Sequence, residues 1–279
     1  MVFDTKQTLI AALNVHDIAT LLVQAGQQIL LPLFYRQDFT QQQKTDCSIV
    51  TEADTRCQFV LQQQLQQYAL TAWPDGTIGF LGEEMSEDEQ YACLTCHETF
   101  WCLDPLDGTG NFAANTPLFT VSLALIHRGS PIMAWIHDPC RNETFMATAG
   151  GGFCINGCRW RSRRAVQKLT QATGFIDFKR LSASSITPWI QPMVYRSQRN
   201  LGSCALEWAW LAGGRGAFIV HGKQKLWDYA AGVLLCEEAG GSVSDFCGNH
   251  PFSTSRLHSS IAAAANQSLH QQMLLLVRN

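Results

Sequence analysis

The sequence predicts an α+β fold in which sheets and helices form a layered sandwich. Three observations support this class. Short apolar strands separated by turns fill the middle of the first half, the second half alternates helical and strand-like segments, and 46% of the 279 residues are hydrophobic. Because no internal repeat or long linker is visible, we expect one domain, 1–279, with subregions 1–150 and 151–279.

Apolar spacing predicts two helices at the start of the chain. Residues 8–31 carry apolar side chains at helical intervals, and Pro32 is expected to end that helix. The polar stretch at 41–43 is expected to lie in a mobile loop that spans 37–47. Residues 51–69 predict the second helix. Its expected apolar side consists of Phe59, Val60, Leu61 and Leu65.

Strands are expected next along the chain. Residues 77–81 and 99–103 are apolar runs that end in carboxylates, and 120–126, 132–138 and 144–147 predict a meander with turns at 128–129 and 140–142. The glycines at 150–152 indicate a tight connection, and Asn156-Gly157 indicates a hairpin.

The second half predicts alternating elements. We expect a strand at 168–174, a helix at 186–195, a helix at 203–212, a strand at 217–220, a helix at 227–238, a strand at 261–264 and a helix at 267–277. Paired glycines at 213–214 and 240–241 end two of these helices.

Charge and composition exclude some classes. With 20 basic and 23 acidic residues the net charge is −3, so no general basic field favours nucleic acid. A local basic cluster follows the 156–157 turn, where a solvated loop is the favoured interpretation. It consists of Arg159, Arg161, Arg163 and Arg164. Residues 1–10 do not resemble a signal peptide, and no apolar run reaches the roughly 18 residues of a spanning helix, so we expect a cytoplasmic protein without a membrane partner.

The 11 cysteines are expected to be mostly free thiols. Cys93 with Cys96 and Cys154 with Cys158 form two close pairs. The second pair lies in a strand-like segment rather than a knuckle, so the spacing does not favour zinc.

Carboxylates recur at the ends of apolar segments, at Glu83-Glu84, at Asp104 and Asp107, and at Asp228. Taken singly, Glu83-Glu84 is interpreted as a solvated turn, the segment with Asp104 and Asp107 as a surface turn, and Asp228 as a helix cap. Together, converging carboxylates would repel one another unless a cation lay between them. Oxygen ligands of this kind select Mg²⁺ or Mn²⁺.

The segment from Asp104 to Thr109 combines the features of a metal and phosphate site. Pro105 is expected to turn the strand there, so that Asp104 and Asp107 face one pocket. Gly108 permits close backbone approach, and the amides of Gly108 and Thr109 suit an anion at the start of a helix or an anion-binding turn.

These residues resemble the inositol monophosphatase family of Mg²⁺-dependent, lithium-sensitive phosphatases. The segment WCLDPLDGTGNF at 101–112 is similar to that family's first signature, and WDYAAGVLLCEEAGG at 227–241 to its second. Shorter matches are VTEAD at 50–54, GEE at 82–84 and GSCA at 202–205. The matches run in the family's order from about residue 44 to 241.

The resemblance implies a five-layer αβαβα sandwich, two to three Mg²⁺ ions, a homodimer, and hydrolysis of a phosphate monoester on a small soluble metabolite. It makes 1–150 the metal-site half and 151–279 the substrate-side half. The implied metal ligands are Glu83, Asp104, Asp107, Asp228 and the carbonyl of Leu106. Glu83 and Thr109, the latter supported by Asp54, would orient the attacking water. The implied substrate contacts are Gly108, Thr109, Gly202, Ser203, Cys204 and the position of His221.

His221 departs from the pattern of the inositol-specific enzymes, which carry a glutamate seven residues before the aspartate of the second signature. With Lys223 and Lys225 nearby, a second anionic group on the substrate and an unused surface loop are both open interpretations.

Two alternatives follow from the resemblance. One is a 3′(2′),5′-bisphosphate nucleotidase, although Gly110-Asn111-Phe112 is more similar to the monophosphatase branch. The other is a protein- or RNA-binding factor on the same fold, for which the cluster at 159–164 is the sequence support. Fructose bisphosphatases and histidinol phosphatases share the fold as well.

Overall fold

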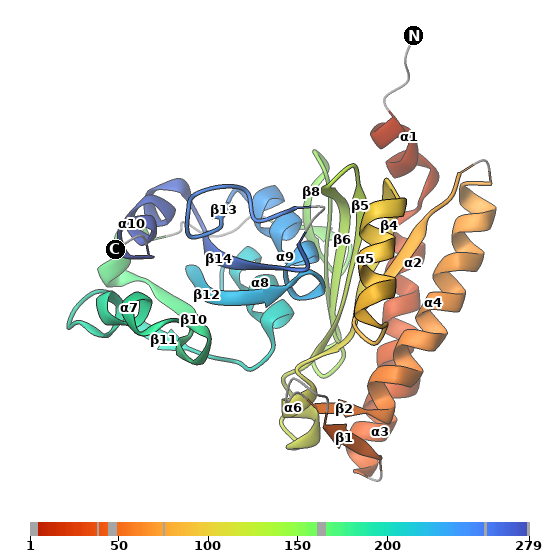
Figure 1. Ribbon diagram of the computed structural model, residues 1–279, viewed down its shortest axis with the longest axis horizontal. Helices are drawn as coiled ribbons and strands as arrows, with labels where there is room; N and C mark the ends of the chain where they lie inside the picture. Colours follow the sequence, from red (N-terminus) through yellow and green to blue (C-terminus); the bar gives the residue numbers. More distant parts are fainter. Residues whose placement is uncertain are drawn as a thin grey trace.

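The computed structural model describes residues 5–37, 39–43, 49–74, 76–160, 166–253 and 256–277. Its two larger sheets have seven strands, in the order β3-β4-β5-β6-β7-β8-β9, and five strands, in the order β11-β10-β12-β14-β13. Figure 1 shows α2 and α4 outside the larger sheet, α8 and α9 between the sheets, and α7 and α10 beyond the smaller sheet. The expected αβαβα sandwich is therefore confirmed.

The first helical region differs from the single helix expected at 8–31. It consists of α1 (Thr5–Ala12), α2 (Val15–Ala25), a π-helical turn (Gly26–Leu30) and α3 (Leu31–Arg36). Asn14 breaks it by accepting a hydrogen bond from the amide of His16. Pro32 does not end it, because Pro32 occupies the first turn of α3 directly after the widened turn, where a missing N–H is tolerated.

The helical stretch Val15–Arg36 is, among the described residues, the one long and apolar enough to cross a membrane by length and composition, and half of its apolar window is buried. Ile18, Leu22 and Leu30 are fully buried in a core shared with α4 and the seven-stranded sheet. The indole N–H of Trp135 in β6 also donates to the carbonyl of Val15. These contacts are those of a core helix.

The glutamines expected in a loop form a strand instead. β1 (Gln41–Gln43) pairs antiparallel with β2 (Ile49–Thr51), and residues 38 and 44–48 of the expected mobile loop lie outside the described residues. The expected second helix is α4 (Glu52–Ala72), whose start is fixed by reciprocal bonds between Thr51 and Asp54. Phe59 was wrongly assigned to its apolar side, because 61% of Phe59 is exposed.

The expected meander is confirmed in the seven-stranded sheet. Its elements are β3 (Gly79–Gly82), α5 (Glu87–Cys96), β4 (Thr99–Asp107), α6 (Thr109–Ala113), β5 (Thr120–His127), β6 (Ser130–Asp138), β7 (Glu143–Thr148), β8 (Gly152–Ile155) and β9 (Cys158–Arg159). Asn156 and Gly157 form the expected hairpin turn with φ values of 49° and 77°. Residues 161–165, which include most of the basic cluster, lie outside the described residues.

The pairing of β8 with β9 separates the second pair of cysteines. Cys154 lies opposite Arg159, whereas Cys158 lies opposite Ile155. Because successive residues of a strand face opposite sides, the two thiols project to different faces. The strand pairing therefore does not bring these two thiols together on one face.

The second half of the chain builds the five-stranded sheet and its helices. Its elements are a 3₁₀ turn (Leu169–Gln171), β10 (Thr173–Asp177), a 3₁₀ turn (Phe178–Arg180), α7 (Ala183–Ile186), a 3₁₀ turn (Thr187–Ile190), β11 (Ser197–Arg199), α8 (Cys204–Ala212), β12 (Phe218–Lys225), α9 (Leu226–Glu238), β13 (Ser242–Ser244), β14 (His258–Ala264) and α10 (Gln267–Val277).

Three expectations in this half are corrected. The strand expected at 168–174 begins only at Thr173, after a 3₁₀ turn. The helix expected at 186–195 is replaced by short turns, since Pro188 and Pro192 limit a longer helix. The segment 222–225, for which an unused surface loop is one of the two open interpretations, continues β12 after a register shift between His221 and Gln224.

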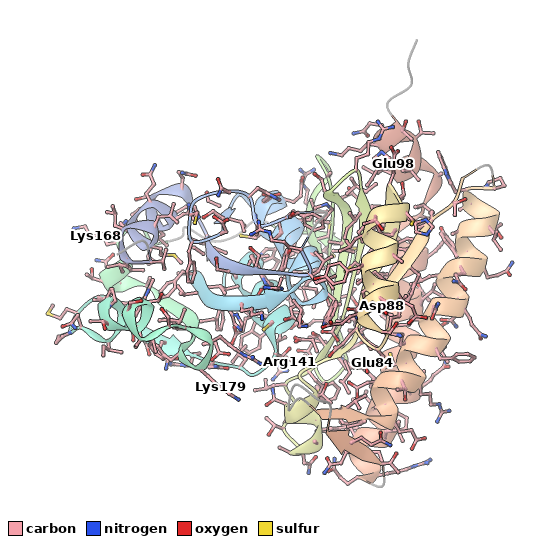
Figure 2. All side chains as sticks on the ribbon, in the orientation of Figure 1. Glu84, Asp88, Glu98, Arg141, Lys168 and Lys179 are labelled. Carbon is pink, nitrogen blue, oxygen red and sulfur yellow. The ribbon has the colours of Figure 1, made fainter. Side chains whose placement is uncertain are left out.

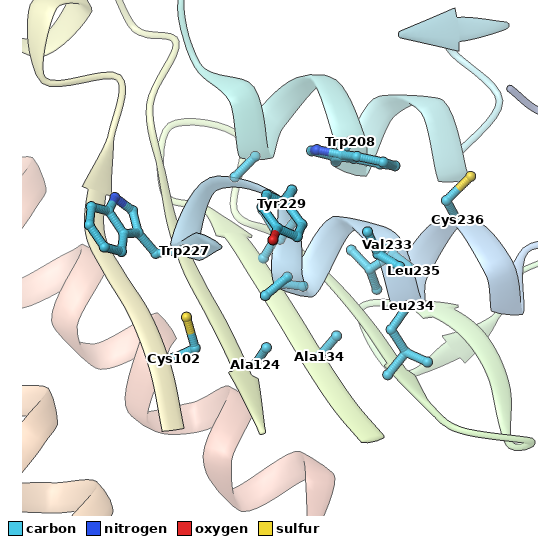
Figure 3. Close-up of a cluster of buried hydrophobic side chains, with 14 of the residues drawn as sticks. Cys102, Ala124, Ala134, Trp208, Trp227, Tyr229, Val233, Leu234, Leu235 and Cys236 are labelled. Atoms are coloured by element: carbon cyan, nitrogen blue, oxygen red, sulfur yellow. The ribbon is translucent and has the colours of Figure 1, made fainter. Parts of the chain in front are cut away.

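Small side chains let α9 lie close to both neighbouring layers, and this packing positions the site. Ala124 and Ala134 of the sheet lie beneath α9, and Trp208 of α8 lies above it (Figure 3). A Cβ atom added at Gly232 would lie 2.1 Å from Cγ of Trp208, so only glycine fits there. The N-terminus of α9, with Asp228, is thereby held close to the end of β4.

Candidate metal centre

Three aspartates form the centre of the site. Among the described residues, Asp104, Asp107 and Asp228 are the group of acidic, histidine or cysteine side chains that could hold a metal ion, with ligand atoms within 4.8 Å of one another. Asp104 and Asp107 are buried, and Asp228 is half-buried. The sequence expectation that the two signatures converge is therefore met by the geometry.

A β-bulge turns Asp104 and Asp107 toward the same region. Asp104 lies opposite Ser122 and Asp107 opposite Thr120, so β4 has one residue more than β5 between the two pairs. The amide of Leu106 donates to Oδ1 of Asp104 at 3.0 Å. The strand therefore does not turn away at Pro105, as the sequence suggested, but runs on to Asp107 with one extra residue.

The start of α8 holds Asp107 in place. The Ser203 hydroxyl and the Ala205 amide, the latter at 2.7 Å, donate to Oδ2 of Asp107. The amide of Cys204 donates to Oδ1 at 3.1 Å. These bonds join the first signature to the GSCA segment. The residues expected at the leaving-alcohol side thus also orient an expected metal ligand.

Asp228 and Glu83 approach from other elements. Asp228 lies in the first turn of α9 and accepts from the amide of Lys225 at 2.9 Å. Glu83 follows β3, and its backbone amide donates to the carbonyl of Leu103 at 3.1 Å. Glu83 is not in the group of three, but its charge contributes to the electrostatics of Asp104 and Asp228.

The electrostatics favour a bound cation. Burial raises the pKa of Asp104 well above its ordinary value, and the negative charges of Glu83 and Asp107 raise it further. The pKa of Asp228 is raised well above its ordinary value for the same reasons, burial first. Burial also raises the pKa of Asp107, although its hydrogen bonds oppose this. Carboxylates gathered in this way fit a hard divalent cation, which offsets both the burial and the mutual repulsion.

A second network links Thr109 to α4. The Thr109 hydroxyl lies 2.9 Å from Oδ1 of Asp54 and 3.0 Å from the carbonyl oxygen of Leu106. The other oxygen of Asp54 accepts from the amide and hydroxyl of Thr51, at 2.7 and 2.6 Å. Burial raises the pKa of Asp54 to about 6, against the effect of these bonds. The Leu106 carbonyl keeps a second lone pair for another ligand.

Gly108 allows the chain to turn sharply after Asp107. Its φ is 97°, and an added Cβ atom would lie 2.8 Å from the carbonyl oxygen of Leu118. This left-handed conformation and this contact both require glycine. Gly202 has a φ of 70° and lies against Asn111, whose side chain donates to the carbonyl of Leu201 at 2.7 Å. Asn111 therefore connects the two sides of the site.

His221, which the resemblance places among the substrate contacts, is buried and contacts Lys223 and Asp177. It is only 4% exposed, its Nδ1 accepts from the amide of Lys223 at 3.2 Å, and its Nε2 lies 3.4 Å from Oδ2 of Asp177. Sequence reasoning did not single out Asp177. The signal was nevertheless present, because Asp177 is another carboxylate at the end of an apolar run.

Comparison with known proteins agrees with this geometry. A family model described as the inositol monophosphatase family matches residues 12–279. Nus factor SuhB of Escherichia coli is 36% identical over 214 residues, which are 75% of this chain and 76% of that protein. The fructose-1,6-bisphosphatase/inositol-1-monophosphatase of Thermotoga maritima is 29% identical over 268 residues, 91% of this chain and 97% of that protein.

The solved structure of a Thermotoga maritima IMPase has a TM-score of 0.77 and 29% sequence identity to this chain, and the match covers 94% of this chain and 95% of that one. The match of the family model over most of the chain, the sequence relatives and the shared fold lead to one conclusion. The chain belongs to the inositol monophosphatase family.

Proposed function

We propose that the chain is a Mg²⁺-dependent phosphatase that hydrolyses a phosphate monoester of a small metabolite. The observation that carries this proposal is the convergence of Asp104, Asp107 and Asp228 beside the left-handed turn at Gly108. Carboxylate oxygens select Mg²⁺ or Mn²⁺, and two to three ions fit the proposed ligand set. Those ligands are Glu83, Asp104, Asp107, Asp228 and the carbonyl of Leu106.

The protein's own groups bind and orient the reactants in this proposal. When bound, Mg²⁺ supplies positive charge for the transferring phosphoryl group and lowers the pKa of water. Thr109, held by Asp54, orients the attacking water together with Glu83. The amides of Gly108 and Thr109 hold the phosphate, and Gly202, Ser203 and Cys204 border the leaving alcohol. Placing water and phosphate in line is the main task, because hydrolysis of phosphate monoesters is extremely slow without a catalyst.

A substrate with a second anionic group is favoured by a group of basic side chains next to Asp228. This basic ridge consists of the cations Lys223, Lys225 and Arg256, with the His258 imidazole beside them. Lys225 and His258 are paired across β12 and β14. Burial lowers the pKa of His258, and the positive charges of Lys223, Lys225 and Arg256 lower it further, so these groups lie near one another. Bisphosphates of sugars or nucleosides are therefore included among the candidate substrates.

A binding role in transcription complexes is the alternative of another class. It is suggested by relatives named Nus factor SuhB. Alanine at both Asp104 and Asp107 separates the two roles. A binding factor would keep its partners and its cellular phenotype in this variant, whereas a phosphatase would lose its activity.

The direct test is phosphate release with millimolar Mg²⁺ from a panel of substrates. The panel contains inositol 1-phosphate, fructose 1,6-bisphosphate, histidinol phosphate and adenosine 3′,5′-bisphosphate. Thermal melting with and without Mg²⁺ tests the metal site independently, since a ligand at 100 times its Kd stabilises by about 2.7 kcal/mol. Activity that needs Mg²⁺ supports the proposal. Equal, negligible release with and without Mg²⁺ on every compound would favour the binding role.

A further inference from the structure

The carboxyl end of β10 places an acidic side chain near the proposed metal centre. Asp177 ends β10 and lies opposite His221 of the parallel strand β12. In open α/β sheets, ligands bind outside the carboxyl ends of parallel strands. Figure 2 labels Lys179, which follows Asp177, at the lower edge of the five-stranded sheet in that view.

His221 orients Asp177 and has no nitrogen left for a ligand. Because Nδ1 of His221 accepts from the Lys223 amide at 3.2 Å, the neutral ring carries its proton on Nε2. That nitrogen lies 3.4 Å from Oδ2 of Asp177 and 3.9 Å from Sγ of Cys204. The imidazole is buried, so it serves as an internal donor to the carboxylate.

Asp177 itself remains partly open. Its side chain is 20% exposed, and its Oδ1 accepts from the amide of Lys179 at 3.0 Å. Burial acts to raise the pKa of Asp177, but the bonds from His221 and Lys179 outweigh it and hold the pKa below its ordinary value. A carboxylate has about four acceptor positions. Two are used within the protein, so the remaining ones suit hydroxyl groups of a ligand.

Cys204 connects Asp177 to the proposed metal centre. Its amide donates to Asp107 at 3.1 Å, and its thiol lies against His221. Burial raises the pKa of this thiol, and the charges of Asp228 and Asp107 on one side and Asp177 on the other raise it further. Asp177 therefore lies one side chain beyond Cys204, on the side proposed for the leaving alcohol.

We propose that Asp177, positioned by His221, accepts hydrogen bonds from hydroxyl groups of the leaving alcohol and so selects among alcohols by their hydroxyl groups. This inference rests on the proposed phosphatase function. In this inference a carboxylate on β10 distinguishes leaving alcohols that carry further hydroxyl groups from those that do not. His221 acts only through Asp177.

The test compares two substrates in the full-length protein with saturating Mg²⁺. Inositol 1-phosphate presents hydroxyl groups to Asp177, whereas p-nitrophenyl phosphate does not. Asp177→Asn should raise the KM for inositol 1-phosphate about tenfold, the expected loss for one hydrogen bond to a charged group. It should change the constants for p-nitrophenyl phosphate less than twofold. Asp88→Asn, at an exposed position of α5, is the matched control.

His221→Gln tests the positioning role. It should raise the KM for inositol 1-phosphate while leaving p-nitrophenyl phosphate unchanged, and the double variant should be no worse than Asp177→Asn alone. Additive losses, or equal losses on both substrates, would overturn the inference, as would an unchanged KM in Asp177→Asn. A wild-type protein that releases no phosphate from these two substrates or from any other compound of the panel would instead refute the phosphatase function itself, and the inference with it.

Discussion

Two groups of buried and half-buried carboxylates lie close to each other and differ in their surroundings. Asp104, Asp107 and Asp228 gather within one small volume. Besides burial, the charges of Asp107 and Asp228 raise the pKa of Asp104, and the charge of Asp107 raises the pKa of Asp228. Asp177 and Glu207 are outside that group of three, and each has a donor of its own. The donor is His221 for Asp177 and the amide of Leu201, at 2.7 Å, for Glu207. A shared cation is favoured in the first group, because one ion offsets charges that repel one another within one volume even where each carboxylate also has hydrogen-bond donors.

Removing one charge from the first group should have the largest effect. Asp104→Asn keeps the shape of the side chain but loses a proposed metal ligand. We expect phosphate release to fall by about 10³-fold, as when a contact to a developing charge is removed. The same variant should melt at a higher temperature than the wild type in EDTA, because a buried repulsive charge is gone. A lower melting temperature in EDTA would show that the cluster is already stabilised without a cation.

Thr109 tests whether the hydrogen-bonded network behind the first group acts in catalysis. Thr109→Val removes the hydroxyl that contacts Asp54 and Leu106 and preserves the volume. We expect about a 10²-fold loss of kcat, within the range of one positioned catalytic group. Thr109→Ser, which restores the hydroxyl, should recover most of the activity. If the valine variant were as active as the serine variant, the attacking water would be oriented by other groups.

The pH dependence of the free energy of unfolding tests the second group through Glu207. Glu207 is 4% exposed, and burial raises its pKa from 4.5 to about 8. A carboxyl whose pKa is higher in the folded state stabilises the protein below pH 4.5, and this contribution is lost as the pH rises toward 8. Glu207→Gln should therefore match the wild type near pH 4.5 and exceed its free energy of unfolding by roughly 5 kcal/mol above pH 8. Denaturant unfolding across this range, without metal, measures the difference, and parallel curves for the two proteins would refute the assignment.

An exposed ion pair gives the smallest expected effect. Arg128 Nε lies 3.2 Å from Oε2 of Glu98, and the side chains are 63% and 72% exposed. Glu98→Gln should change the free energy of unfolding by less than about 0.5 kcal/mol. The same denaturant titration provides the comparison. A larger loss here would mean that surface charge contributes to stability as much as the buried groups do.

Local sequence signals correctly predicted the elements that are marked by apolar runs or bounded by characteristic turn and cap residues. Apolar runs placed the meander, paired glycines placed the ends of α8 and α9, and Asn156-Gly157 placed a hairpin. Local signals failed where other parts of the chain accommodate a residue that is unfavourable in that element. Pro32 is accommodated by a π turn, and the glutamines of β1 are paired with β2.

The sequence by itself determined which residues bear the chemistry: the carboxylates of the two signatures, the glycine that follows Asp107, and the resemblance to a phosphatase family. Only the tertiary structure decided their partners. It attached Asp107 to the start of α8, turned His221 inward and placed Asp177 beside it. The physical reason is that residue type and spacing specify periodicity and turns over a few residues, whereas these contacts join positions 44 to 98 residues apart, which only the packing of the layers brings together.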